Sequence, residues 1–176
     1  MQIKLQCFAL FLALVTVACD PFNYDAKHPS DAKLISNFAE HEDTFQKLVR
    51  MSNQDSQVIW VARDFTRLET NWGWPRPDSE LGFSRQRWNE YRKLFNQLGL
   101  ESGLDRESSS NGAAIYLVAC SKGMTMRGSS KGYVYSEQPL TNVVASLDSE
   151  ARLPANTKHG AMYKPIKEHW YLCYEW

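Results

Sequence analysis

Apolar residues recur with two different periods along the chain, and these periods predict two helices and several strands. Between Ser30 and Met51 the apolar positions have near-helical spacing, and Ser30 or Asp31 is available as the N-cap. A second segment with this spacing begins at Ser84 and stops at Gly99, a residue that suits a helix C-terminus. Both segments are predicted to be amphipathic helices, each with one row of apolar side chains that is buried against the rest of the domain.

Short segments rich in β-branched and aromatic residues predict the strands. They are Gln57–Arg63, Ala113–Cys120, Lys131–Ser136 and the two arms of a C-terminal hairpin, Met162–Ile166 and Trp170–Glu175. Residues Ala113–Cys120 lack polar alternation, which predicts a central strand covered on both faces. Pro165 places the first arm of the hairpin at a sheet edge, because its missing N–H costs no ladder bond there.

The segments between these elements are polar or rich in glycine and proline. Residues 64–83 and 101–112 are predicted to be irregular, and 121–130 to be turn-like. The order helix, strand, helix, then four strands predicts an α+β domain. We expect a largely antiparallel sheet of about five strands with both helices packed on one face. Residues 30–176 are expected to form a single domain, because their number suits one core and leaves little room for two.

The first thirty residues have the pattern of an export signal followed by a tether. Lys4 precedes an uncharged run from Phe8 to Ala18, which is about half the length that spans a bilayer as a helix. Such a run matches the apolar region of a secretory signal. Residues 1–18 are therefore predicted to be a signal peptide. Residues 19–29, with two prolines and no period, are predicted to be a tether.

The residues that precede Cys19 resemble a bacterial lipobox, in which the cysteine thiol receives a diacylglycerol and the chain is cut in front of it. Ala18 is the small residue before the cysteine, while Thr16 stands where the lipobox usually has leucine. The resemblance implies a lipid-anchored, periplasm-facing protein of the cell envelope. Asp20 resembles the inner-membrane retention signal of enteric-type Gram-negative bacteria. An ordinary secretory signal cut near Ala18 is the alternative.

Charge and cysteine content indicate which partners and cofactors are not expected. The chain has 20 basic and 20 acidic residues, so a nucleic-acid partner is not expected. Cys7 leaves with the signal and Cys19 is used for lipidation, which leaves Cys120 and Cys173. These two could form a disulfide in an oxidising compartment, or each could be a small buried apolar residue. No C-x-x-C motif or Cys/His cluster occurs, so neither a metal nor a cofactor is expected.

Catalytic motifs with recognisable spacing are missing from the sequence. Neither a nucleophile elbow nor a phosphate-binding glycine motif occurs, so no catalytic residue is assigned. Trp72 and Trp74 beside Arg76 could form a flat platform for a sugar, peptide or protein, or the rings could fix their loop to the sheet. A hydrolase with dispersed residues, using His159 or His169, is a further alternative.

The C-terminal third resembles a set of uncharacterised lipoproteins of Gram-negative bacteria. The resemblance rests on KGYVYS at Lys131–Ser136, SLD at Ser146–Asp148, Tyr163-Lys164-Pro165-Ile166 and Trp170-Tyr171-Leu172. These motifs are structural in character and imply no catalytic residue. We therefore predict a membrane-anchored envelope lipoprotein with a non-catalytic binding domain. An immunity or inhibitor lipoprotein directed against a secreted toxin is the narrower alternative.

Overall fold

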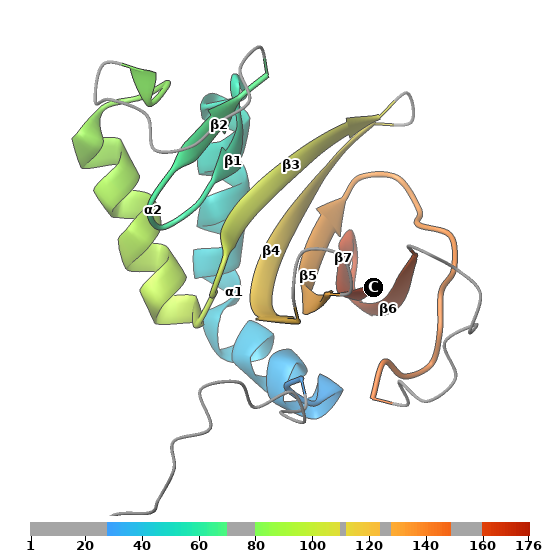
Figure 1. Ribbon diagram of the computed structural model, residues 1–176. Helices are drawn as coiled ribbons and strands as arrows, with labels where there is room; N and C mark the ends of the chain where they lie inside the picture. Colours follow the sequence, from blue (N-terminus) through green and yellow to red (C-terminus); the bar gives the residue numbers. More distant parts are fainter. Residues whose placement is uncertain (1–27, 70–79, 110–111, 124–127, 149–159) are drawn as a thin grey trace, which may run out of the picture.

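One sheet and two helices make up the described part of the chain (Figure 1). The computed structural model describes residues 28–69, 80–109, 112–123, 128–148 and 160–176. In chain order the elements are α1 (Asp31–Gln54), β1 (Val58–Val61), β2 (Thr66–Leu68), α2 (Arg85–Leu98), β3 (Gly103–Ser109), β4 (Gly112–Lys122), β5 (Ser129–Ser136), β6 (Ala161–Lys167) and β7 (Trp170–Glu175). Both predicted helices and the C-terminal hairpin are confirmed.

The strands form a single antiparallel sheet in the order β2-β1-β3-β4-β5-β7-β6. The predicted α+β class and the largely antiparallel sheet are confirmed, but the sheet has seven strands rather than about five. β4 is the central strand, as predicted. β6 is an edge strand, so Pro165 lies where a missing N–H is tolerated.

Two strands lie in segments that the sequence predicts to be irregular. β2 falls within residues 64–83, and β3 falls within residues 101–112. β3 pairs with β1 on one side and β4 on the other, so its backbone is hydrogen-bonded although its residues are mostly polar. Its polar residues are tolerated because the face of β3 turned away from the helices lines a cavity. Leu104 is buried, whereas the following Asp105 points to the other face.

The helices cover one face of the sheet, and the aromatic core lies between them and the strands (Figure 1). Phe45 of α1 is fully buried. Its ring centroid lies 4.5 Å from that of Tyr133 on β5 and 5.7 Å from that of Trp170 on β7. Ile115 and Leu117 of β4 join this core.

The opposite face of β4 is not fully covered. Tyr116 and Val118 alternate with the buried residues of this strand and are only half-buried. The prediction that Ala113–Cys120 is covered on both faces is therefore wrong. The strand lacks polar alternation because it places aromatic and aliphatic side chains on its open face as well.

Residues 137–148 run around the β6 edge of the sheet from the open face to the helix face. Leu140 packs against a small apolar cluster of Val134, Tyr163 and Cys173. The N–H of Val144 then donates to the carbonyl of Tyr163 (2.8 Å). Further along the segment, Leu147 is buried in the main core. This segment therefore covers part of the exposed edge and links the two faces.

Cys120 and Cys173 are free, so the disulfide alternative is wrong. Cys120 on β4 pairs with Lys131 of β5, and Cys173 on β7 pairs with Gly132 of β5. With β5 between them, their strands lie about 9.6 Å apart, and a disulfide tolerates a Cα separation of only about 7 Å. Each cysteine is instead a small buried residue, as the second alternative holds.

Substituting alanine at two left-handed glycines tests the packing at the start of β3. Gly103 has φ 85°, and an added Cβ would lie 2.2 Å from the carbonyl oxygen of Val61. Gly99 has φ 65° but open space around it. Gly103→Ala should lower the free energy of unfolding by about 3 kcal/mol, and Gly99→Ala by only about 1 kcal/mol. Urea unfolding followed by tryptophan fluorescence measures both. Equal losses would show that β3 does not approach β1 this closely.

Candidate functional site

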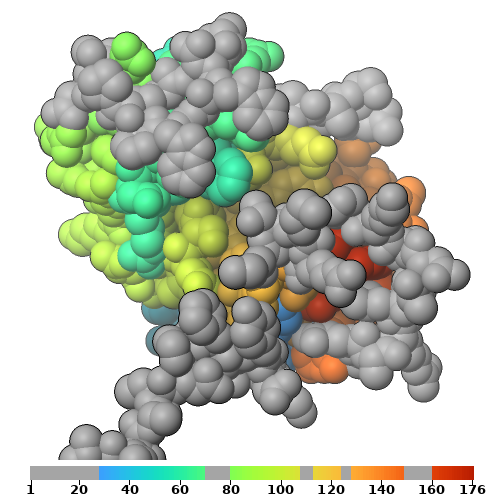
Figure 2. Space-filling view, in the orientation of Figure 1, coloured from blue at the N-terminus to red at the C-terminus, as the bar shows by residue number. Residues whose placement is uncertain are grey.

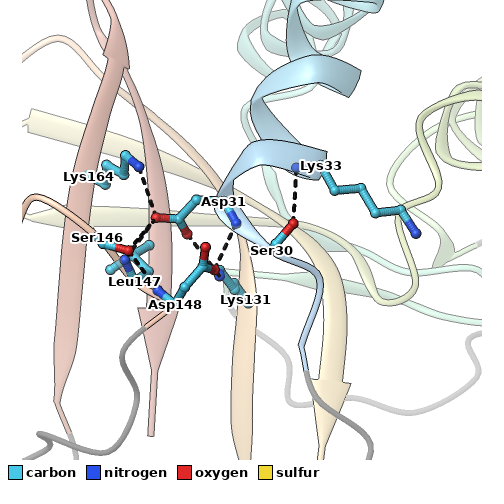
Figure 3. A network of polar contacts seen from close by, with 8 residues as sticks. All are labelled: Ser30, Asp31, Lys33, Lys131, Ser146, Leu147, Asp148 and Lys164. Atoms are coloured by element: carbon cyan, nitrogen blue, oxygen red, sulfur yellow. Dashed lines mark hydrogen bonds and ion pairs between the residues drawn. The ribbon is translucent and has the colours of Figure 1, made fainter.

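A buried group of charges joins the first residue of α1 to the C-terminal half of the sheet (Figure 3). Asp31 and Lys131 have side chains that are only 4% and 1% exposed, and their charged atoms lie 2.9 Å apart. Lys131 Nζ also lies 2.8 Å from Asp148 Oδ1. Lys164 Nζ lies 2.9 Å from the second carboxylate oxygen of Asp31. We call these residues, with Ser146 and Leu147, the Asp31 network.

Backbone and hydroxyl groups complete the Asp31 network. The N–H of Leu147 donates to Asp31 Oδ2 (2.9 Å), the hydroxyl of Ser146 donates to the same oxygen (3.2 Å), and the N–H of Asp31 donates to Asp148 Oδ1 (2.8 Å). Burial by itself would raise the pKa of Asp31, but hydrogen bonds from Lys131, Leu147 and Lys164 lower it to about 2. Asp31 and Lys131 are buried and paired with each other, and the more exposed Asp148 and Lys164 pair with them from the rim, so the charges of this network are used within the fold.

The Asp31 network accounts for much of the C-terminal motif pattern. Lys131 belongs to KGYVYS, Ser146–Asp148 is the SLD segment, and Lys164 lies in the Tyr-Lys-Pro-Ile segment. Three segments that are separated in sequence therefore meet at one aspartate. The sequence motifs are expected to be structural, and their shared contact with Asp31 gives a physical reason for that role.

Asp31→Asn tests the Asp31 network. The variant leaves Lys131 buried beside Asp148 alone, and it should lower the free energy of unfolding at pH 7 by about 3 kcal/mol or more. The folded-state pKa of Asp31 is below its ordinary 3.8, so its contribution is complete above about pH 4 and is lost as the pH falls through about 2. The difference between wild type and variant should shrink over that range. Asp43→Asn, at an exposed position of the same helix, is the control in urea unfolding. A wild-type-like Asp31→Asn variant would contradict this role.

The open face of the sheet carries a second group of polar side chains. Cross-strand pairing places Arg67 opposite Trp60, Trp60 opposite Asp105, and Asp105 opposite Tyr116. Directly paired residues share a face, so these four side chains form one row across β2, β1, β3 and β4. Figure 2 shows the surface of β3 in yellow, between the green surface of α2 and the orange and red of the C-terminal strands.

A cavity of about 680 Å³ lies along this row. Ser121, Ser130 and Glu175 line its other side, and Ile59 and Val118 add apolar surface. This volume and mixture of aromatic, aliphatic and polar groups are typical of a ligand or partner site. We call this region the open-face cavity.

The open-face cavity is acidic. Its lining includes four carboxylates, from Glu69, Asp105, Glu107 and Glu175, and two guanidinium groups, from Arg67 and Arg106. The Arg106 side chain is directed to the end of α1, where its Nε donates to the Ser52 hydroxyl (3.3 Å) and its Nη2 to Asn53. Arg67 Nη2 lies 3.8 Å from Asp105 Oδ1. Among the described residues, the cavity lining therefore carries more negative than positive charge.

The pKa values of two of these carboxylates are raised. Burial, opposed by Arg67 and reinforced by Glu107 and Glu175, raises the pKa of Asp105 to about 6. Burial also raises the pKa of Glu175, against a hydrogen bond from the Ser130 hydroxyl to Glu175 Oε2 (2.9 Å). These carboxylates are close enough to destabilise each other's charge. An incoming cation would relieve that repulsion.

Two aromatic residues form the floor of the open-face cavity. The guanidinium of Arg67 lies over the Trp60 ring, 5.3 Å from its centroid. The hydroxyl oxygens of Tyr116 and Tyr163 lie 3.2 Å apart. Burial and this hydrogen bond raise the pKa of Tyr116, so its phenol stays neutral at physiological pH. The two rings of the floor are therefore uncharged at physiological pH.

The predicted site residues are distributed as follows. Cys19, Trp72, Trp74, Arg76 and His159 lie outside the described residues. His169 is in the β6–β7 turn with φ 63°, and its Nε2 lies 3.6 Å from Glu168 Oε1. The N–H of Ser136 donates to the His169 carbonyl (2.9 Å), but within the described ranges the His169 ring forms no hydrogen bond with a serine or cysteine side chain.

His28, which the sequence places in the tether, packs against the domain. Its Nε2 lies 2.8 Å from the Ser129 hydroxyl, and its ring meets Tyr174 edge-on at 5.4 Å. The tether predicted for residues 19–29 is therefore shorter at its C-terminal end.

Sequence reasoning missed the open-face cavity. Its residues come from several strands, and two of these strands lie in segments predicted to be irregular. The sequence does contain one signal for this site. Asp105 and Glu107 are two residues apart, so in a strand their carboxylates lie on the same face. No group of three or more His, Cys, Asp or Glu side chains within the described ranges is arranged to bind a metal.

Comparisons of the chain with protein-family models, with curated proteins and with solved structures find no match. The resemblance to bacterial lipoproteins stays a prediction. Neither described helix is long and apolar enough to cross a membrane.

Titration of Asp105 tests the electrostatics of the open-face cavity. Carboxyl NMR of the wild type should give a pKa near 6 for this residue. Glu107→Gln and Glu175→Gln should each lower that value, and Arg67→Met should raise it. Because the pKa is raised in the fold, ionisation of Asp105 should reduce stability as the pH rises from about 4 to about 6. Titration near 3.8 in the wild type would contradict this arrangement.

Proposed function

We propose that this protein is a lipid-anchored lipoprotein of the cell envelope whose domain binds a partner in the open-face cavity and catalyses no reaction. The cavity carries this proposal. It combines about 680 Å³ of space with aromatic, aliphatic and acidic groups that the fold does not need for its core. Such unused side chains on one face are typical of a recognition surface.

The contacts of the serines favour binding over hydrolysis. Ser130 donates its hydroxyl hydrogen to Glu175, so this serine already has a partner. Acyl transfer by serine normally uses a histidine that accepts the hydroxyl proton. Among the described lining residues of the cavity there is no histidine. The hydrolase alternative based on His169 gains no support, because that side chain lies in the hairpin turn.

The position of the N-terminus fits a short membrane tether. Residues 20–27 separate the proposed lipid on Cys19 from His28, and a fully extended segment of this length reaches at most about 28 Å. His28 and the Asp31 network fix the point where the tether meets the domain. The domain would therefore act close to the membrane surface. An immunity or inhibitor role is a narrower form of the same proposal, with a toxin as the partner.

Photo-crosslinking in cells tests both parts of the proposal. A benzophenone amino acid at Ser121, an exposed residue that lines the cavity, should crosslink the membrane-bound protein to one discrete partner. The same group at Glu168, in the β6–β7 turn, is the control and should give no such product. Cys19→Ser should move the protein out of the membrane fraction. Products of equal yield from both positions would contradict the binding site, and a membrane-bound Cys19→Ser variant would contradict the anchor.

A further inference from the structure

We infer that the open-face cavity binds a segment of a protein partner that presents an arginine or lysine side chain. This inference rests on the proposed function and names the chemistry of the partner. It follows from the charge of the cavity, from the way the protein already binds one of its own cations there, and from the shape of the lining.

The acidity of the cavity is local. The chain as a whole has equal numbers of acidic and basic residues, whereas the described residues of the cavity lining supply four carboxylates and two guanidinium groups. One of those groups, on Arg106, is bound to Ser52 and Asn53 at α1. Within the described part of the chain, neither Glu107 nor Glu175 has an ion-pair partner. Their charges are available to an incoming cation.

Arg67 shows how this surface holds a guanidinium. Its charged group lies over the Trp60 ring at 5.3 Å and 3.8 Å from the Asp105 carboxylate. An aromatic face and a carboxylate together stabilise a cation more than either does alone. The protein thus supplies an internal example of the contact that we assign to a partner.

Tyr116 offers a second aromatic ring near carboxylates, and no cation from the described residues lies over it. Tyr116 lies two strands from Trp60 in the same row, and Asp105 stands between them. Glu107 and Glu175 line the same cavity as Tyr116, and their charges raise the pKa of its hydroxyl. A second guanidinium or ammonium group placed over this tyrosine would meet two carboxylates. It would reduce the repulsion that raises the pKa of Asp105.

The rest of the lining favours a peptide segment as the source of the cation. Ile59 and Val118 provide apolar surface for the methylene stem of an arginine or lysine side chain. Ser121 and Ser130 add hydroxyl groups at the cavity wall that suit a peptide backbone. An anionic membrane surface, by contrast, would be repelled by the acidic lining.

Fluorescence polarisation with three labelled peptides tests this inference on the full-length protein in a neutral detergent. The first peptide alternates arginine and glycine, and in the others glutamine or glutamate replaces arginine. We expect only the arginine peptide to bind. Its Kd should rise at least tenfold in the variant Glu107→Gln/Glu175→Gln. The glutamine at 175 can still accept the Ser130 hydrogen bond, so folding should be preserved. Urea unfolding of the variant checks this.

The control variant Glu40→Gln/Glu168→Gln makes the same change in net charge at two exposed positions. It should bind the arginine peptide as the wild type does. Equal Kd values for the two double variants, equal binding of the glutamine peptide, or no binding of the arginine peptide would each overturn the inference. If the crosslinked partner from position 121 is still captured by Glu107→Gln/Glu175→Gln, the proposed function stands and the cationic contact is excluded.

Discussion

The pairing of Asp31 with Lys131 is the contact on which the arrangement of this domain depends. Both side chains are nearly removed from water, and a buried charge without its partner costs several kcal/mol. The start of α1, β5, β6 and residues 146–148 must therefore meet at one point. Apolar packing alone would tolerate a shift of α1 along the sheet, but a network of directed hydrogen bonds does not. The Asp31 network thus fixes the position of the α1 N-terminus relative to β5 and β6.

Fixing α1 on one face of the sheet determines what the other face can be. The aromatic core around Phe45 uses the residues of β5 and β7 that point to the helices. The alternating residues of the same strands face the other side, where Val134 and Cys173 pack in the small cluster with Leu140, while Ser130 and Glu175 line the cavity. On β3, two consecutive residues face opposite sides of the sheet: Leu104 is buried in the core, and Asp105 faces the cavity. The acidic surface is a consequence of one-sided packing.

The parts of this structure that sequence predicts are those with local signals. Ser84 and Gly99 mark both ends of α2, and the aromatic residues around a short polar turn mark the C-terminal hairpin. β3 escapes prediction because its order comes from pairing with β1 and β4, and its side chains carry little apolar pattern. The Asp31 network escapes for a different reason: Asp31 and Lys164 are 133 residues apart, and no local rule joins them. The open-face cavity depends on strand register, which the sequence does not specify by itself.

The two polar groups of the molecule are coupled through that register. Ser130 and Lys131 are consecutive on β5 and therefore point to opposite faces of the sheet. The register that brings Lys131 beside Asp31 is the one that sets Ser130 opposite Glu175. A slip by one residue would exchange the two faces, and it would expose the lysine to the cavity while burying a serine against α1. The high cost of an unpaired Asp31 opposes this slip. The buried ion pair on one face thereby stabilises the pattern of carboxylates on the other.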